Sequence, residues 1–152
     1  MHLESPAFEL NQMIPKRHTC EGENLSPPLK FEELPSGTKS LVLIVDDPDA
    51  PMGTFDHWIA WNIPGNLHEL KEGAKLAEEG TNGFGEKGYK GPCPPKGKPH
   101  RYFFTLFALD SELDLPPGSS KAAVKNAMKD HILGTAQTIG LYQRKIGMKI
   151  AP

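Results

Sequence analysis

The chain has 152 residues, of which 38% are hydrophobic, and this length and composition suit one compact domain spanning residues 1–152. Its formal net charge is −2, with acidic and basic residues interspersed, which argues against nucleic acid as a partner. No apolar run approaches the roughly 18 residues of a membrane span, and the start of the chain lacks the pattern of a signal peptide, so we expect a cytoplasmic protein.

The first part of the chain contains one strong strand signal and two weak ones. Residues 3–8 and 29–32 are the weak candidates, whereas residues 40–46 carry five consecutive aliphatic side chains between Gly37 and Pro48. A short apolar run that is bounded by turn residues is typical of a buried strand. We therefore expect residues 40–46 to form a buried strand of a sandwich.

Two longer strands are predicted at residues 57–63 and 100–109. In the second of these, the period of two puts His100 and Tyr102 on one face together with three apolar residues. The opposite face begins with Arg101, for which a structural contact is expected, and is otherwise mostly apolar. Both faces of this strand are therefore expected to be covered.

A single helix is expected over residues 119–133, followed by a weaker strand at residues 135–142. Ser119 or Ser120 can cap the start of the helix, and Gly134 is placed to end it. Fifteen glycines and fifteen prolines fit many short strands joined by shaped turns. Together these elements predict an all-β fold, namely a two-sheet antiparallel β-sandwich with one substantial helix in its C-terminal region.

Two motifs that suggest a cofactor or a metal fail on inspection. Residues 83–88 spell the glycine-rich dinucleotide fingerprint, but the segment that follows contains Gly91 and Pro92 and cannot begin the required helix. The acidic stretch that begins at Asp47 is similar to the start of a calcium loop, but Pro51 occupies the third ligand position. The histidines also lack the close spacing that marks a metal site, so we expect neither a cofactor nor a metal.

Four polar residues remain as candidates for a binding site. Asp47 directly follows the buried strand and precedes Pro48, which restricts its backbone, while His100 and Tyr102 extend from one strand face about 7 Å apart. Each feature alone has an ordinary explanation, since turns are often acidic and a lone histidine such as His57 is usually packed or exposed without a role. If the side chains converge, they offer imidazole and phenol donors to one oxyanion.

Five sequence motifs occur in a characteristic order along the chain. They are Cys20-Glu21-Gly22-Glu23-Asn24-Leu25-Ser26-Pro27-Pro28-Leu29, Asp47-Pro48-Asp49-Ala50-Pro51, His57-Trp58, Gly91-Pro92-Cys93-Pro94-Pro95-Lys96-Gly97 and His100-Arg101-Tyr102. In this combination the chain closely resembles the phosphatidylethanolamine-binding protein family from near residue 5 to residue 144. It is similar in particular to the shorter prokaryotic branch, which is often called Raf-kinase-inhibitor-like.

The resemblance implies a β-sandwich with a small pocket for phosphate-like and carboxylate anions. The residues that match the pocket of the family are Asp47, His57, Pro95, His100 and Tyr102. We expect the Asp47 carboxylate to raise the pKa of His57 or His100, and so to favour the imidazolium form that donates hydrogen bonds to an anion.

The resemblance also brings the loops of Cys20 and Cys93 toward one end of the sandwich. A disulfide between them is one alternative, and a pair of free thiols in a reducing cytoplasm is the other. Pairing requires Cα atoms within about 7 Å of each other, a distance that the sequence does not determine.

The expected function is binding of a small anionic or phosphorylated ligand, with regulation of a protein kinase or a protease as the wider role. An acid–base enzyme that acts on a phosphoester with the same histidine, aspartate and tyrosine side chains is the alternative. A homodimer scaffold is a third interpretation, in which the pocket stays empty. Turnover of phosphoesters would separate an enzyme from a binding protein.

Overall fold

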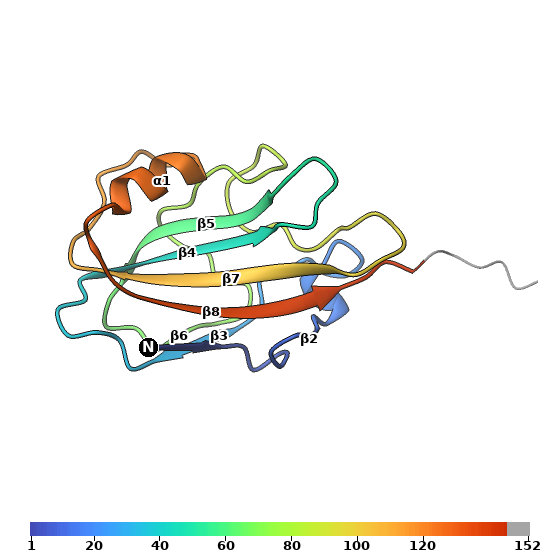
Figure 1. Cartoon of the computed structure of the whole chain (residues 1–152), viewed down its shortest axis with the longest axis horizontal. Coiled ribbons are helices and arrows are strands. Elements are labelled where there is room, and N and C mark those ends of the chain that lie inside the picture. Colours follow the sequence, from blue (N-terminus) through green and yellow to red (C-terminus); the bar gives the residue numbers. More distant parts are fainter. Residues whose placement is uncertain (146–152) are drawn as a thin grey trace, which may run out of the picture.

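The computed structural model describes residues 1–145 and contains two β-sheets with one α-helix beside the larger sheet (Figure 1). The larger sheet has the strand order β2-β8-β7-β4-β5, and the smaller sheet has the order β1-β3-β6. The strands are β1 (His2–Glu4), β2 (Gln12–Met13), β3 (Leu29–Glu32), β4 (Ser40–Asp47), β5 (Phe55–Pro64), β6 (Glu69–Leu70), β7 (His100–Leu109) and β8 (Ile132–Tyr142). The helices are the α-helix α1 (Lys121–Met128) and the short 3-10 helix η1 (Lys16–His18).

Neighbouring strands pair in the antiparallel direction with one exception. β2 pairs with β8 in the parallel direction, with Gln12 opposite Gly140 and Met13 opposite Leu141. No tight turn determines the direction of this pair, because β2 and β8 lie near opposite ends of the described chain. The prediction of a mostly β fold with two sheets and one helix is confirmed, but the purely antiparallel pairing is wrong at this edge.

One apolar cluster includes residues of both sheets. Leu3 and Phe31 of the smaller sheet belong to it, together with Leu43, Phe104 and Leu106 of the larger sheet, and all of these side chains are buried. Full burial of an aliphatic or aromatic side chain contributes about 1.5–3 kcal/mol relative to exposure. The fold that positions the strand ends is therefore stabilised mainly by this shared core.

The opposite face of the larger sheet carries a second cluster beneath α1. Ile44 of β4 belongs to this cluster together with Val124 and Met128 of α1, so both faces of β4 are covered, as its apolar run predicts. On β7, the face that begins with Arg101 is exposed or half-buried until Leu109. The expectation that both faces of β7 are covered is therefore confirmed only in part, because Phe107 and Leu109 pack in the second cluster whereas Arg101 is exposed.

The α-helix is shorter than the sequence predicts. Ser120 caps its start by accepting a hydrogen bond from the backbone N–H of Ala123 at 3.1 Å, but the helix ends at Met128. Asp130 then takes a left-handed conformation with a φ of 70°, and β8 begins at Ile132, which pairs with the end of β7. The predicted helix end at residue 133 is wrong, because Ile132 pairs with Leu109 of β7 and therefore belongs to β8. Within residues 1–145, no helix has the length and apolarity to cross a membrane.

Strand boundaries differ most at the first strand and at the two shortest strands. β3 and β7 match the predicted residues 29–32 and 100–109, and β4 extends one residue further than predicted. The first strand covers only His2–Glu4 instead of residues 3–8. β2 and β6 have two residues each, which is too short for an alternating pattern, and the sequence predicts neither of them.

Candidate functional site

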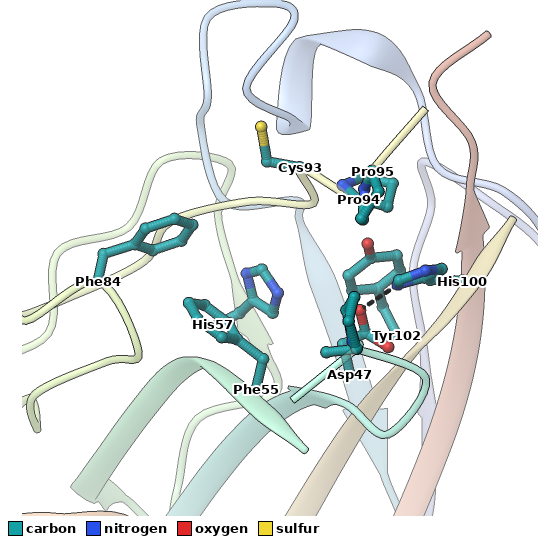
Figure 2. Close-up of a pocket in the computed structure, with 11 residues that line it drawn as sticks. Asp47, Phe55, His57, Phe84, Cys93, Pro94, Pro95, His100 and Tyr102 are labelled. Atoms are coloured by element: carbon teal, nitrogen blue, oxygen red, sulfur yellow. Dashed lines mark hydrogen bonds and ion pairs between the residues drawn. The ribbon is translucent and has the colours of Figure 1, made fainter. Parts of the chain in front are cut away.

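A pocket lies where the end of β4 meets the beginnings of β5 and β7 (Figure 2). β4 runs antiparallel to both neighbours, so Asp47 lies opposite Phe55 of β5, and Asp46 lies opposite Phe103 of β7. The pocket has a volume of about 190 Å³ and brings together all five residues that the sequence selects. These residues are Asp47, His57, Pro95, His100 and Tyr102, and the wall also contains Ala50, Pro51, Phe55, Phe84, Cys93 and Pro94.

Asp47 is held in place by two hydrogen bonds. Its Oδ2 accepts a hydrogen bond from Nδ1 of His100 at 2.6 Å, and its Oδ1 accepts one from the backbone N–H of Asp49 at 2.7 Å. The side chains of Asp47 and His100 are only 4% and 12% exposed. Since an ionised carboxylate only accepts hydrogen bonds, Nδ1 of His100 carries a proton, and Nε2 is the nitrogen left for a ligand.

Arg101 lies outside the pocket lining and fixes the position of the loop after β4. Its guanidinium donates to both carboxylate oxygens of Asp49 at 2.9 and 2.8 Å, and its backbone N–H donates to the same side chain at 2.9 Å. The side-chain hydrogen bond from Arg101 is the main reason why the pKa of Asp49 falls to about 2. Arg101 thus makes the structural ion pair that the sequence suggests.

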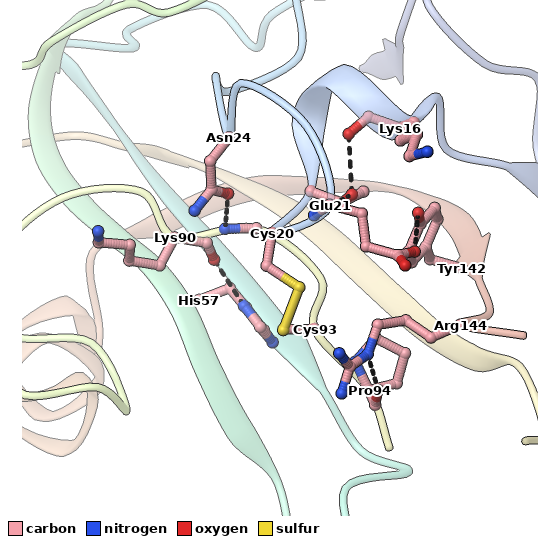
Figure 3. The surroundings of a disulfide bond; sticks show 12 residues. Lys16, Cys20, Glu21, Asn24, His57, Lys90, Cys93, Pro94, Tyr142 and Arg144 are labelled. Carbon is pink, nitrogen blue, oxygen red and sulfur yellow. Dashed lines mark hydrogen bonds between the residues drawn. A yellow bond between two sulfur atoms is a disulfide. The ribbon is translucent and has the colours of Figure 1, made fainter. Parts of the chain in front are cut away.

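His57 is buried in the pocket wall, with 3% of its surface exposed. Its Nδ1 donates a hydrogen bond to the backbone carbonyl of Lys90 at 2.6 Å (Figure 3). Burial lowers the pKa of His57, and this effect exceeds the opposing influence of the Lys90 carbonyl and the Asp47 carboxylate. The expectation of a raised pKa is therefore wrong for His57, because loss of solvent penalises the charged imidazole more than Asp47 favours it.

The hydroxyl of Tyr102 is buried and has no hydrogen-bond partner within residues 1–145. Burial raises the pKa of Tyr102, and the nearby Asp47 carboxylate acts in the same direction, so the phenol keeps its proton at neutral pH. Figure 2 shows the hydroxyl directed toward the loop of Pro94 and Pro95. A hydrogen-bond acceptor bound in the pocket can therefore take the hydrogen bond that this hydroxyl offers.

Two phenylalanines form an apolar wall beside His57. The ring centroids of Phe55 and Phe84 lie 5.1 and 6.0 Å from that of His57, and 4.8 Å from each other. A Cβ at Gly83 would lie 2.5 Å from the Phe55 ring, so glycine is required for this contact. The sequence suggests only a flexible loop here, because no periodic pattern connects Phe84 with the strands.

A disulfide joins Cys20 to Cys93, and Cys93 itself lines the pocket (Figure 3). The two Cα atoms lie 5.4 Å apart, within the roughly 7 Å that a disulfide requires. Cys20 also donates its backbone N–H to the carbonyl of Pro92 at 3.1 Å, and the backbone N–H of Gly91 donates to Oδ1 of Asn24 at 2.8 Å. The loop that carries Cys93 is therefore tied to the N-terminal part of the chain.

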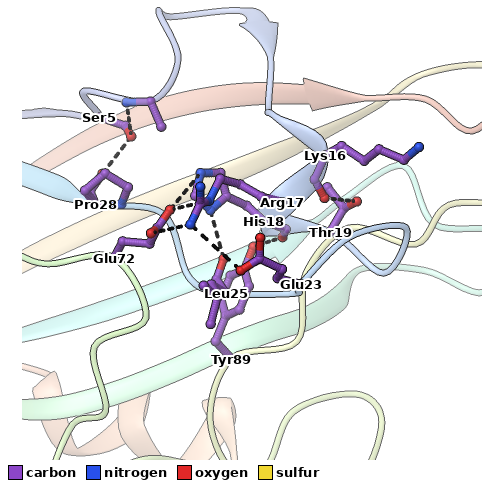
Figure 4. Close-up of polar contacts among 11 residues, drawn as sticks. Ser5, Lys16, Arg17, His18, Thr19, Glu23, Leu25, Pro28, Glu72 and Tyr89 are labelled. Atoms are coloured by element: carbon purple, nitrogen blue, oxygen red, sulfur yellow. Dashed lines mark hydrogen bonds and ion pairs between the residues drawn. The ribbon is translucent and has the colours of Figure 1, made fainter.

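A polar cluster fixes the segment around η1 (Figure 4). Arg17 pairs with Glu72 at 2.7 Å, and Nδ1 of His18 donates to the carbonyl of Leu25 at 2.9 Å. The hydroxyl of Tyr89 donates to the carbonyl of His18 at 2.6 Å. Burial lowers the pKa of His18, which lies outside the pocket lining. This buried histidine thus fixes the segment that leads to the disulfide.

The pocket offers few groups that could hold a metal. Among residues 1–145, no three or more His, Cys, Asp or Glu side chains are arranged as a metal-binding group. Asp47 and His100 are in contact, but His57 uses its Nδ1 for the Lys90 carbonyl. The expectation that the site needs neither a metal nor a cofactor stays a prediction.

Sequence comparison finds relatives that match along nearly the whole chain. The model of the family described as "Phosphatidylethanolamine-binding protein" matches residues 4–143. The chain is 50% identical over 151 residues to a UPF0098 protein of Methanothermobacter thermautotrophicus, with 95% of this chain and 99% of that protein covered. A UPF0098 protein of Pyrococcus horikoshii is 49% identical over 151 residues, with 93% of this chain and 76% of that protein covered.

Two solved structures share the fold. A phosphatidylethanolamine-binding protein homologue from Chlamydia trachomatis has a TM-score of 0.91 at 42% identity, and the match covers 95% of this chain and 97% of that chain. YbcL of Escherichia coli, described as a new member of the mammalian family, has a TM-score of 0.88 at 33% identity, and the match covers 95% and 98%. The chain therefore belongs to the phosphatidylethanolamine-binding protein family.

Proposed function

We propose that the chain is a cytoplasmic binding protein, built as a two-sheet sandwich, whose pocket takes a small anionic group such as a phosphate-like headgroup or a carboxylate. The observation that carries this proposal is the convergence of His57, His100 and Tyr102 on one pocket beside Asp47. Membership of a family named for binding a phospholipid supports the same ligand class. A volume of about 190 Å³ suits a headgroup, since pockets for drug-sized molecules have roughly 300–1,000 Å³.

His100 and Tyr102 supply donors for an oxyanion. In its protonated form, His100 donates through Nε2, while Asp47 balances the charge through the 2.6 Å hydrogen bond at Nδ1. Tyr102 adds the hydroxyl that has no partner within the described chain. The apolar part of the ligand lies against Phe55 and Phe84, whose rings stack edge to face beside the polar groups.

Exposed apolar side chains at the rim favour a ligand that a larger molecule presents. Met52 is 99% exposed on the loop that carries Ala50 and Pro51, and Phe84 is 49% exposed. A protein segment with a phosphorylated or acidic side chain would cover these residues while its anion occupies the pocket. A protein kinase or a protease is therefore the proposed partner class.

A homodimer formed through this rim would instead show twice the chain mass in light scattering and would exclude small anions.

An acid–base enzyme is the second candidate, because Asp47 orients His100 in the way that a carboxylate orients a general base. Binding is the better supported function for two reasons. The described lining contains no serine or threonine nucleophile, and the sulfur of Cys93 is part of a disulfide. Measurable turnover in a panel of phosphomonoesters and phosphodiesters, lost in His100→Ala, would favour the enzyme instead.

Isothermal titration calorimetry with inorganic phosphate tests the binding proposal. We expect His100→Ala to weaken phosphate affinity by about tenfold or more, because a hydrogen bond to a charged group contributes about 1.5–3 kcal/mol. Tyr102→Phe removes only the hydroxyl and should weaken affinity by up to about tenfold, since a neutral hydrogen bond contributes less.

The matched control is His131→Ala, because His131 is an exposed histidine whose Nδ1 donates to Asp110 at 2.8 Å, far from the pocket lining. This variant should bind phosphate as the unchanged protein does. Absence of phosphate binding by the unchanged protein, or equal affinities for all three variants, would contradict the proposal.

A further inference from the structure

The second nitrogen of His57 gives the pocket a hydrogen-bond acceptor. Nδ1 of His57 donates to the Lys90 carbonyl at 2.6 Å, and a carbonyl oxygen has no proton to donate in return. In the neutral ring, Nε2 therefore carries a lone pair and no proton. Burial lowers the pKa of His57 and so favours this neutral ring near pH 7. An anion without a proton could not form a hydrogen bond with Nε2, because both atoms would be acceptors.

Asp47 and Tyr102 lie beside His57 on the pocket face of the larger sheet, whereas Asp46 and Asp56 lie on the opposite face, where both pair with Lys121 of α1. Asp47 and Asp46 come from β4, and Asp56 comes from β5 itself. Tyr102 of β7 stands with its ring centroid 5.3 Å from that of His57 and is uncharged. The acidic groups favour a proton on His57, but burial is the largest influence on its pKa and the net direction is downward. Asp47 therefore adds negative charge beside a neutral ring, whereas the charges of Asp46 and Asp56 are balanced by Lys121 on the other face of the sheet.

The described lining of the pocket contains no lysine or arginine. The nearby Lys121 is already paired with Asp46 and Asp56, at 3.3 and 2.6 Å. The cation that the lining can offer is protonated His100, and its charge of +1 is balanced by the charge of −1 on Asp47, which gives a sum of zero. A doubly charged ligand would find no net compensation, whereas a singly charged ligand faces less repulsion.

We propose that the pocket selects oxyanions that carry a proton, and that His57 accepts the hydrogen bond from that proton. This inference rests on the proposed function and narrows its ligand class to monoanions such as a singly protonated phosphate monoester. In the complex, His100 and Tyr102 donate to two ligand oxygens, while the ligand O–H donates to Nε2 of His57. Phosphate monoesters lose this proton near pH 6, whereas phosphodiesters and sulfate have none to donate in this range.

Calorimetry with three small ligands tests the inference on the unchanged protein. At about pH 5.5, methyl phosphate is mostly a protonated monoanion, dimethyl phosphate is a monoanion without a proton, and sulfate is a dianion without a proton. We expect methyl phosphate to bind about tenfold more tightly than dimethyl phosphate, which is the usual contribution of one hydrogen bond to affinity, and sulfate to bind most weakly.

Equal affinity for methyl and dimethyl phosphate, or tighter binding of sulfate, would overturn the inference and leave the proposed function intact. Failure of all three ligands to bind would contradict the proposed function itself.

His57→Phe assigns the preference to one residue. We expect this variant to lose about tenfold in affinity for methyl phosphate and at most about twofold for dimethyl phosphate, so that the preference disappears. The control His131→Phe should keep the preference of the unchanged protein, because His131 lies outside the pocket lining. A preference that persists unaltered in folded His57→Phe would refute the role of His57.

Nitrogen-15 NMR of the unchanged protein provides a test that does not depend on the folding of a variant. Two-bond correlations between ring protons and ring nitrogens show whether Nε2 of His57 carries a proton. We expect Nε2 to be unprotonated in the free protein near pH 7 and in the complex with methyl phosphate. A protonated Nε2 in that complex would overturn the inference, because His57 would then be a second donor to the anion.

Discussion

At the scale of single residues, the pocket depends on which nitrogen of each histidine is already occupied. His100 uses its Nδ1 for the Asp47 carboxylate, and His57 uses its Nδ1 for the Lys90 carbonyl. Both rings therefore present Nε2 to a ligand, but His57 is more completely buried than His100. Two residues of one type can thus serve as different groups, because the neutral ring of His57 offers Nε2 as an acceptor, whereas Nε2 of His100 becomes a donor when that ring carries a second proton.

Asp49 gives the protein a pH-dependent stability that is separate from the pocket. Its pKa in the folded state is about 2, below the ordinary value of 3.8, because Arg101 donates hydrogen bonds to it. The unfolded chain therefore binds this proton first, and the contribution to stability is present above about pH 4 and is lost as the pH falls toward about 2. We expect urea denaturation to show Asp49→Asn less stable than the unchanged protein at about pH 5, with a smaller difference at about pH 3.

Asp114→Asn is the control for this experiment, since Asp114 is exposed and has no ion pair within residues 1–145. Its stability relative to the unchanged protein should be the same at both pH values. A difference for Asp49→Asn that does not shrink in acid would show that Arg101 does not stabilise the ionised form.

At the scale of elements, the loop of residues 91–97 forms one wall of the pocket. Residues near both ends of the described chain contact this loop and fix its position. Nε of Arg144 donates to the carbonyl of Pro94 at 2.7 Å. Gly91 lies against the carbonyl of His18, where a side chain would have no room. These contacts, together with the disulfide, determine where the prolines of the loop lie relative to the strand ends.

Reduction of the Cys20–Cys93 disulfide should lower the stability of the protein. The bridge links residues 73 positions apart, and removing a native bridge typically costs about 2–5 kcal/mol. We expect a lower urea midpoint after reduction, and weaker phosphate binding because Cys93 lines the pocket. The double variant Cys20→Ser/Cys93→Ser should resemble the reduced protein and should not respond to reductant. Equal midpoints for the oxidised and reduced protein would contradict a stabilising role.

The disulfide also bears on the cellular compartment. Most cytoplasmic proteins keep their thiols reduced, whereas intracellular proteins of hyperthermophiles are often rich in disulfides. The proposed cytoplasmic location is therefore compatible with the Cys20–Cys93 bridge in a hyperthermophile. In other cells the two are compatible where the bridge forms only under oxidising conditions.

At the scale of the whole molecule, the place of the pocket follows from the strand order. Because β4 runs antiparallel between β5 and β7, its last residue meets the first residues of both neighbours. The alternating pattern of β7 is enough to predict that His100 and Tyr102 share a face. Placing Asp47 and His57 beside them required the family resemblance, because no local pattern encodes contacts between distant strands.

Other features depend on contacts that no local pattern contains. The helix ends at Met128 because Ile132 is needed for pairing with β7, although its spacing fits the helix. Phe84 reaches the pocket from a loop, and its contact with Phe55 depends on the space that Gly83 leaves. The net direction of the pKa of His57 likewise depends on burial, which the fold determines and the order of residues near His57 does not.

A crystal structure of the protein grown with methyl phosphate would show directly whether the pocket binds a protonated oxyanion. We expect the ligand in the pocket, with one oxygen about 3 Å from Nε2 of His100 or the hydroxyl of Tyr102 and another about 3 Å from Nε2 of His57. An empty pocket at a saturating ligand concentration, or a ligand bound only elsewhere on the molecule, would contradict this expectation.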